Sequence, residues 1–251
     1  MGLISMENER YKRNNIYINE TEQNLIAQTK ILLAGAGLGS YIAECALRIG
    51  FENLTIIDGD SVELSNLNRQ NYIMDNIGHS KTESLLKRLY EINPGANINV
   101  ENVFLNKNNL QDYIKDVDIA INALDFTSNI PFLFDDFCID MGVKVLHPYN
   151  LGWSGFVFFL DKDYSLRQLQ NVNKFEVNVV NYIIQNLNAQ GISTEWIEQC
   201  LDQYLDIQYF MPPPQLSVGS FIISGMCTRI IVDIVLNRKT KKFPQFYYAL
   251  F

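Results

Sequence analysis

The chain has 251 residues, a length that suits one doubly wound sheet with additions, and 47% of them are hydrophobic, which is enough for a large core. Its net charge of −8 argues against general nucleic-acid binding, although an acidic surface does not exclude a nucleotide, because phosphate binding needs only local cations. The four cysteines are scattered without a CxxC pair, which argues against a disulfide framework and against a zinc site.

The first 29 residues are predicted to form a polar N-terminal arm, with a leader over residues 1–8 and a short helix over residues 21–28. No apolar signal region opens the chain, so we expect a cytoplasmic protein. On charge alone, the run Arg10-Tyr11-Lys12-Arg13 is typical of a solvated segment.

A glycine-rich turn follows the first predicted strand. Residues 31–34 are a short apolar run, as in buried parallel strands, and Gly35-Ala36-Gly37-Leu38-Gly39-Ser40 comes directly after it. A helix up to residue 49 and a strand over residues 54–57 complete a βαβ unit. Backbone N–H groups and a helix N-terminus at such a turn can hold phosphate, and Gly35, Gly37 and Gly39 allow positive φ and close backbone approach.

Two acids follow the second strand, in Asp58-Gly59-Asp60. Asp58 stands where a carboxylate accepts hydrogen bonds from ribose hydroxyls. Asp60 either contributes to the nucleotide site or caps the following turn. A glycine turn with such an acid is the usual dinucleotide pattern.

Two cations come after these acids: Arg69 in Ser65-Asn66-Leu67-Asn68-Arg69-Gln70, and Lys81 after Gly78-His79-Ser80. A helix is predicted over residues 80–93, with Ser80 and Glu83 as a capping box. A lysine in the first turn opposes the helix dipole, so Lys81 should pair with an anion. An NAD enzyme has no need of two cations here, but a nucleotide triphosphate does. The alternatives are a solvated lysine and a surface salt-bridge arginine.

A candidate metal ligand follows the next core strand, predicted over residues 116–124. Asp125 comes at its carboxyl end, which is the ligand edge of a parallel sheet, and a carboxylate there can hold Mg²⁺. Cys138 is expected in the core, and His147 has no visible partner and is assigned no chemistry. The patterns also predict strands over residues 98–103, 143–146, 153–160 and 246–250, and helices over residues 108–114, 129–141, 173–188, 194–209 and 218–236.

The last of these helices is apolar enough to raise the question of a membrane span. Arg229 and Asp233 interrupt it, so we expect a helix that is buried in the fold or at a subunit interface. Together the elements predict an α/β fold, a doubly wound, Rossmann-like, mainly parallel sheet with a helical C-terminal extension.

The motifs, in this order, resemble those of the ThiF/MoeB/HesA family, the adenylating enzymes related to ubiquitin-activating enzymes. The resemblance covers roughly residues 10–160, with a weaker echo from Pro212 to the end. It implies a nucleotide-binding adenylation domain over residues 30–163. Residues 164–251 then supply a helical crossover region and a final helix and strand that complete the same domain. The matching pieces are the arginine run from Arg10, the Gly35 turn, Asp58-Gly59-Asp60, the segment 65–70, Gly78 to Lys81, and Asn122-Ala123-Leu124-Asp125.

The resemblance also implies roles. Gly35, Gly37, Gly39, Asp58, Asp60 and Asn66 would bind ATP, with Arg69 and Lys81 on its phosphates and Mg²⁺ on Asp125. Arg13 would reach the partner's ATP across a homodimer. The implied reaction is ATP-dependent adenylation of a carboxylate, the C-terminal glycine of a ubiquitin-like or sulfur-carrier protein or a peptide. We expect no membrane partner, and the net charge argues against a nucleic-acid partner.

The sequence departs from the family at three places. The turn GAGLGS is one residue shorter than the usual GxGGxG, so either a glycine is missing or Ser40 takes the third small position. Phe126 follows Asp125 where asparagine is common. Cys200 is the only candidate for a catalytic cysteine, but it lies in a predicted helix, on or beside the apolar face and among acids, so we interpret it as structural.

Three alternatives stay open. A relative in the same family dehydrates a modified tRNA adenosine, whose carboxylate is activated in the same way; the negative charge counts against it. A non-catalytic protein could keep the nucleotide fold and recruit a partner, as the shortened turn and Phe126 suggest. An NAD-dependent oxidoreductase would leave Arg69 and Lys81 unexplained.

Overall fold

The computed structural model describes residues 9–162, 164–171 and 174–249, and it contains one seven-stranded sheet in the order β3-β2-β1-β4-β5-β6-β7. The first five strands run parallel, and β6 pairs antiparallel with both β5 and β7. The strands are β1 (Lys30–Ala34), β2 (Asn53–Ile57), β3 (Asn97–Glu101), β4 (Ile119–Asn122), β5 (Lys144–Asn150), β6 (Gly155–Leu160) and β7 (Tyr247–Ala249).

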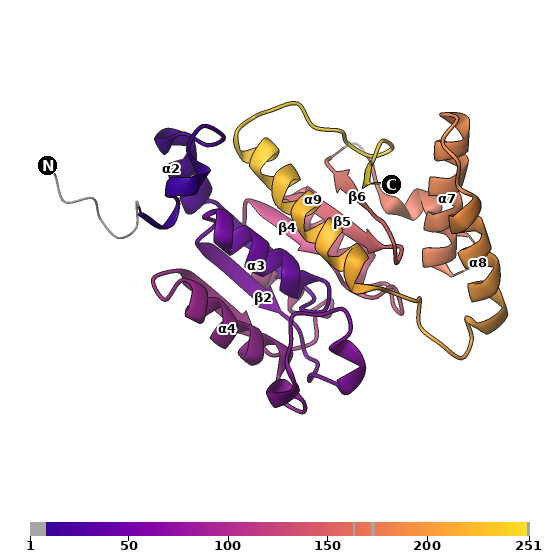
Figure 1. Cartoon of the computed structure of the whole chain (residues 1–251), viewed down its shortest axis with the longest axis horizontal. Helices are drawn as coiled ribbons and strands as arrows, with labels where there is room; N and C mark the ends of the chain where they lie inside the picture. The colour runs from indigo at the N-terminus through magenta and orange to yellow at the C-terminus, as the bar shows by residue number, and fades with distance from the viewer. Residues whose placement is uncertain (1–8, 163, 172–173, 250–251) are drawn as a thin grey trace, which may run out of the picture.

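Helices cover both faces of this sheet, and Figure 1 shows α3 and α9 side by side in front of it. The helices are α2 (Glu20–Gln28), α3 (Gly39–Ile49), α4 (Lys81–Ile92), α5 (Leu110–Ile114), α6 (Ile130–Asp140), α7 (Phe175–Ala189), α8 (Glu195–Ile207) and α9 (Ser217–Val235). Four 3₁₀ turns are η1 (Lys12–Asn14), η2 (Leu64–Asn66), η3 (Met74–Asn76) and η4 (Leu166–Leu169).

The central strands are apolar on both sides because each face of the sheet meets its own core. In β1, Ile31 and Leu33 belong to the core shared with α3, α4 and α9, whereas Leu32 and Ala34 belong to the core shared with α5, α6 and α7. Side chains of a strand alternate between faces, so a run without polar residues fits a strand that is covered twice. The predicted doubly wound, mainly parallel α/β fold is confirmed.

The C-terminal extension joins this sheet through β7, and α9 packs against α3, β5 and β6. The helix is long and apolar enough to cross a membrane, yet 56% of its apolar window is buried inside the fold. A core helix of a soluble fold passes the same length test, and the burial of α9 matches the predicted buried helix.

Several boundaries differ from the predictions. The strand after Asp116 is shorter, because Asp116 has a φ of +62° and pairing of β4 begins only at Ile119. In contrast, β5 continues past Leu146 to Asn150, because β6 supplies an antiparallel partner over that length. Half of the predicted capping box is present: Ser80 accepts from the Glu83 N–H. The predicted leader, residue 173 of one helix and residue 250 of the last strand lie outside the described residues.

Candidate nucleotide-binding site

The glycine turn after β1 approaches the end of β4 more closely than any side chain would allow. Gly35 has a φ of +99°, and a Cβ there would lie 2.5 Å from the carbonyl oxygen of Ala123. Gly37 and Gly39 do not use positive φ, which corrects the expectation for these two. A Cβ on Gly37 would lie 3.1 Å from Gln70 Nε2, whereas Gly39 begins α3 and has space around it.

Ser40 secures the shortened turn from within α3. Its hydroxyl donates to the Gly37 carbonyl at 2.6 Å and accepts from the Asn71 N–H at 3.0 Å. The turn is therefore held against the segment that carries Arg69. The Ser40 N–H donates to the Gly37 carbonyl at 3.2 Å, but no described side chain caps the start of α3, so the N-terminus of this helix is open to an anion.

Asp58 links the end of β2 to the glycine turn. Its carboxylate accepts the Ala36 N–H at 2.6 Å and the Asp60 N–H at 2.8 Å. Burial raises the pKa of Asp58, while the Lys81 charge and these two hydrogen bonds oppose that shift. A carboxylate has about four lone-pair sites, so two remain for further donors such as ribose hydroxyls.

Lys81 and Asp60 form an ion pair beside Asp58, with 2.8 Å between Nζ and Oδ2. The Lys81 side chain is 9% exposed and that of Asp60 is 52% exposed, so the lysine is the enclosed partner. The anion that the helix-dipole argument required is thus Asp60, within the chain itself. The Asp60 carboxylate is used in this ion pair instead of capping the following turn. In addition, the Asp60 backbone carbonyl accepts the Lys81 N–H at 3.0 Å.

Arg69 reaches across to the segment that precedes α9. Its Nε donates to Gln215 Oε1 at 2.9 Å, and its Nη1 donates to the Ser65 carbonyl at 2.7 Å and to Asn68 Oδ1 at 2.9 Å. These partners are neutral, so Arg69 is not an ordinary surface salt-bridge residue. Nothing in the sequence around Gln215 pointed to this contact.

Asn66 is buried, and its Oδ1 accepts the Glu63 N–H at 3.0 Å. This hydrogen bond closes the turn of η2. Asn66 therefore shapes the segment that leads to Arg69. Tyr72, further along the same segment, is buried and donates its hydroxyl to the Ala36 carbonyl at 2.7 Å, a contact that the sequence did not reveal.

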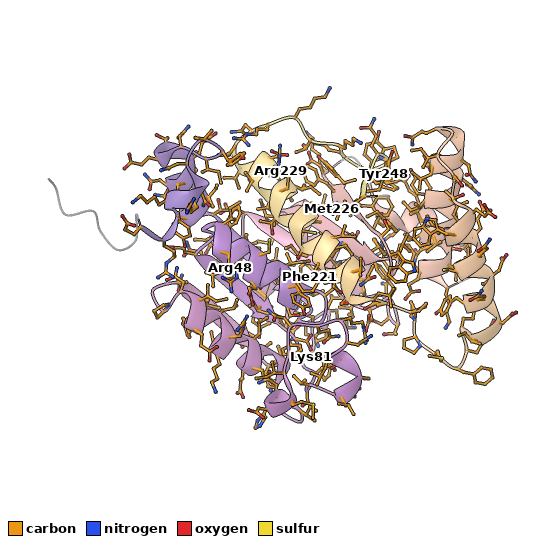
Figure 2. All side chains as sticks on the ribbon, viewed as in Figure 1. Arg48, Lys81, Phe221, Met226, Arg229 and Tyr248 are labelled. Atoms are coloured by element: carbon orange, nitrogen blue, oxygen red, sulfur yellow. The ribbon has the colours of Figure 1, made fainter. Side chains whose placement is uncertain are left out.

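Asp125 and Arg13 lie at opposite ends of the parallel strands. Asp125 is exposed two residues beyond Ala123, which touches Gly35, so the chain carries it to the carboxyl edge. The arm with Arg13 instead lies at the far end of α3, because Asn14 donates to the Ile49 carbonyl at 3.0 Å and Tyr11 donates to Glu52 at 2.7 Å. Figure 2 shows the same separation between Arg48, in the last turn of α3, and Lys81. Within one chain, Arg13 does not join the other site residues.

Phe126, which follows the candidate metal ligand, packs against other aromatic side chains. Its ring centroid lies 4.2 Å from that of Phe175 and 5.1 Å from that of Phe132. These rings form one wall of an open pocket of about 320 Å³ between α6 and α7. The remaining lining residues are polar: Thr127, Ser128, Asn129, Gln170, Asn171, Lys174 and Asn178.

A buried polar network lies behind this pocket and was missed by sequence reasoning. His147 Nε2 is 2.7 Å from Asp135 Oδ1, and the same oxygen accepts from Asn122 Nδ2 at 2.8 Å. Asn122 also donates to the Pro131 carbonyl at 2.9 Å, which fixes the start of α6 beside the end of β4. The expectation that His147 has no partner is wrong, because the fold brings Asp135, which lies on α6, beside this residue of β5.

The cysteine expectations divide. Cys138 is buried in the core as predicted, and burial raises the pKa of its thiol. Cys200 is exposed on α8, so it does not lie on the buried face of that helix, and the interpretation that it takes no part in catalysis stays a prediction.

A family model described as the ThiF family matches residues 11–250. The chain belongs to the ThiF family. The expectation drawn from the spaced motifs is thereby confirmed, and the match extends through the region beyond residue 160, where the motifs had faded.

Among curated proteins, this ThiF-family chain is similar to the adenylyltransferase and sulfurtransferase MOCS3 of Caenorhabditis briggsae. The two are 30% identical over 158 residues, which are 61% of this chain and 39% of that protein. The tRNA threonylcarbamoyladenosine dehydratase of Haemophilus influenzae is 36% identical over 103 residues, 40% of each protein. The SAMP-activating enzyme E1 of Haloferax volcanii is 27% identical over 153 residues, 59% of this chain and 56% of that one. The chain thus spans between 39% and 56% of the length of these relatives.

Solved structures show the same fold. PaaA superposes with a TM-score of 0.71 at 19% identity, covering 98% of this chain and 80% of that one. Escherichia coli MccB with ATP gives 0.68 at 16% identity, covering 90% and 63%. The E. coli tRNA dehydratase TcdA, in complex with ATP, gives 0.54 at 25% identity, covering 60% and 69%.

Proposed function

We propose that this ThiF-family protein catalyses ATP-dependent adenylation of a carboxylate, most favourably the C-terminal glycine of a ubiquitin-like or sulfur-carrier protein or of a peptide. The observation that carries the proposal is the junction of sequence-distant pieces at one edge of the sheet. Asp58 binds the turn at Ala36, Lys81 binds Asp60, and Gly35 lies against Ala123. Family membership and the relatives named as adenylyltransferases support it.

In this proposal the triphosphate lies at the start of α3. The backbone approaches closely at Gly35, and the helix N-terminus offers N–H groups without a side-chain cap. Asp58 would receive the ribose hydroxyls with its remaining lone pairs. Lys81, already oriented by Asp60, and Arg69, held by neutral partners, would neutralise charge on the phosphates.

Asp125 could bind Mg²⁺ only together with ligands from outside the protein. Among the described residues, no group of three or more histidine, cysteine, aspartate or glutamate side chains could hold a metal by itself. Mg²⁺ commonly takes one or two carboxylates and completes its shell with water and phosphate oxygens, so one exposed carboxylate suffices. When bound, it would withdraw charge from the phosphates.

The chemistry then needs no side-chain nucleophile. The substrate carboxylate attacks the α-phosphate, the bond to the β-phosphate oxygen breaks, and pyrophosphate leaves with the electron pair. The chain's own residues position the two reactants and stabilise the developing charge. The product is an acyl-adenylate.

A homodimer would complete this site. The arm that carries Arg13 is held at the C-terminal end of α3, and this helix of eleven residues is about 16 Å long, so Arg13 would serve a partner's site instead of its own. The exposed side of α9 offers a surface for the second copy: Phe221, Met226 and Arg229 lie along its front (Figure 2). Phe221 extends this surface to α3, because its ring centroid lies 4.4 Å from that of Tyr41.

The test is carboxylate-dependent exchange between ATP and pyrophosphate. Purified protein is assayed with carrier proteins ending in Gly-Gly, with peptides and with small acids, and exchange is expected with one class only. Lys81→Ala should reduce exchange at least about tenfold, because it removes a cation from the phosphates. Lys87→Ala, an exposed lysine on the same helix, is the control and should leave exchange unchanged.

Absence of exchange with every acid would refute the adenylation proposal. If ATP still binds, and Lys81→Ala binds it equally well, the protein is better described as a non-catalytic partner-binding member of the family.

One observation favours a second candidate, the dehydratase reaction on a modified tRNA adenosine. The 36% identity to the H. influenzae dehydratase covers 103 residues. The net charge of −8 counts against a tRNA substrate. Supplying the modified tRNA as the acid in the same exchange assay separates the two.

A further inference from the structure

We propose that Phe104 is the surface on which the nucleobase stacks. The inference rests on the proposed function, since it concerns the same nucleotide. It adds a binding residue that none of the sequence motifs contains.

The order of the strands gives the direction in which the base must lie. The glycine turn follows β1, Asp58 follows the neighbouring strand β2, and residues 102–109 follow β3, which is next beyond it. Phosphates at the turn and ribose at Asp58 therefore point the base toward the segment after β3. Phe104 lies three residues beyond the end of that strand, at Glu101.

The ring of Phe104 lies directly on Gly59, between the two acids of the site. A Cβ on Gly59 would come within 2.7 Å of two ring atoms and 2.9 Å of a third. Gly59 has no positive φ, so its need to be glycine comes from this approach alone. The glycine of Asp58-Gly59-Asp60 thus places an aromatic ring beside the carboxylate that would hold ribose.

Phe104 is nevertheless 68% exposed, whereas the residues on either side of it are covered. Leu105 is buried, and Val103 packs against the same core. The Phe104 carbonyl accepts from Asn109 Nδ2 at 3.1 Å and from Asn106 Nδ2 at 3.3 Å. The backbone is therefore fixed on both sides, while a large apolar face is left to water at the rim of the nucleotide site.

A held, exposed ring in this position suits a flat aromatic ligand. Aromatic stacking accepts any base, because every base has a π-face. Phe104 should therefore contribute to the binding affinity for any nucleoside triphosphate, through its base, and should not contribute to the binding of the phosphates. This separates its effect from that of Lys81 and Arg69.

The experiment compares ATP with inorganic tripolyphosphate, which has the charges but no base, by calorimetric titration of the full chain. Phe104→Ala and Phe104→Leu should weaken ATP and GTP binding by about tenfold and leave tripolyphosphate binding unchanged. Phe104→Tyr keeps the ring and should restore wild-type affinity. In Phe104→Trp, ATP should quench an indole fluorescence component that the wild type lacks, and tripolyphosphate should not.

Two results would overturn the inference while leaving the adenylation proposal intact. One is ATP affinity that is equal in the wild type, Phe104→Ala and Phe104→Leu. The other is an equal loss of ATP and tripolyphosphate binding, because the ring would then act through the shape of the site. A wild-type chain that binds no ATP would refute both proposals. Thermal melting of each variant checks that it is folded. If Phe104→Ala does not fold, the comparison is made with Phe104→Leu alone.

Discussion

His147 Nε2 lies 2.7 Å from Asp135 Oδ1, and both side chains are only 1% exposed. The pair joins β5 to α6, and through Asn122 it also holds the end of β4. Among the described residues, Asp135 Oδ2 and His147 Nδ1 have no hydrogen-bond partner. The loop with Asp125 and Phe126 begins and ends on elements joined by this network.

Removing one member of this pair should be costly. His147→Leu leaves the Asp135 carboxylate buried with only Asn122 as a donor, and we expect a loss of about 3–5 kcal/mol in the free energy of unfolding. Denaturant unfolding measures it. Asp136→Ala is the control: this neighbouring residue pairs with Arg167 at the surface and should lose less than about 1 kcal/mol. Similar losses for the two variants would contradict the structural role of the pair.

Glu44 predicts a pH dependence. Its burial alone would raise its pKa, but hydrogen bonds from Asn71, Arg88 and Arg48 outweigh this and hold the pKa below the usual 4.5. A carboxyl whose folded-state pKa is lowered stabilises the fold above its unfolded pKa, and that contribution is lost as the pH falls through the folded value.

At pH 7 the wild type should therefore be more stable than Glu44→Gln by about 1 kcal/mol, because the ionised group makes charge-assisted hydrogen bonds. The difference should shrink as the pH falls below 4.5. Denaturant unfolding of both proteins between pH 3 and pH 7 provides the comparison. A difference that is constant with pH would contradict the assignment.

Asp60→Ala tests the ion pair of the candidate site. It leaves the enclosed Lys81 ammonium without its carboxylate, so the protein without nucleotide should lose about 2 kcal/mol of stability. ATP supplies replacement oxygens, so ATP should raise the melting temperature more in Asp60→Ala than in the wild type. An equal shift in both proteins would mean that the phosphates do not reach Lys81.

Gly35→Ala and Gly39→Ala form a matched pair. At Gly35 the new Cβ meets a carbonyl oxygen at 2.5 Å and the φ is +99°, so we expect a loss of at least about 2–3 kcal/mol. At Gly39 the nearest atom is 3.7 Å away and the residue is helical, so stability should be unchanged or rise by up to about 1 kcal/mol. Thermal melting distinguishes them, and equal effects would show that the turn is looser than described.

The sequence predicted best what is local. The strand before Gly35, the acids after β2 and the helix after Ser80 are all encoded by neighbours in the chain, so their patterns were visible. Contacts between distant segments were not. Arg69 and Gln215 are 146 positions apart, and His147 finds Asp135 only after α6 has packed on β5. Phe104 had no motif, because its place depends on Gly59 in the neighbouring loop.

The hydrogen bond from Arg69 to Gln215 has a consequence for regulation. Gln215 lies in the segment just before α9, and the outer side of this helix is exposed to solvent. A phosphate that drew Arg69 away would release that stretch, and a protein seated on α9 would in turn alter how readily Arg69 leaves. Such coupling is reciprocal by thermodynamic necessity, so occupancy of either location would be communicated to the other through a single guanidinium group.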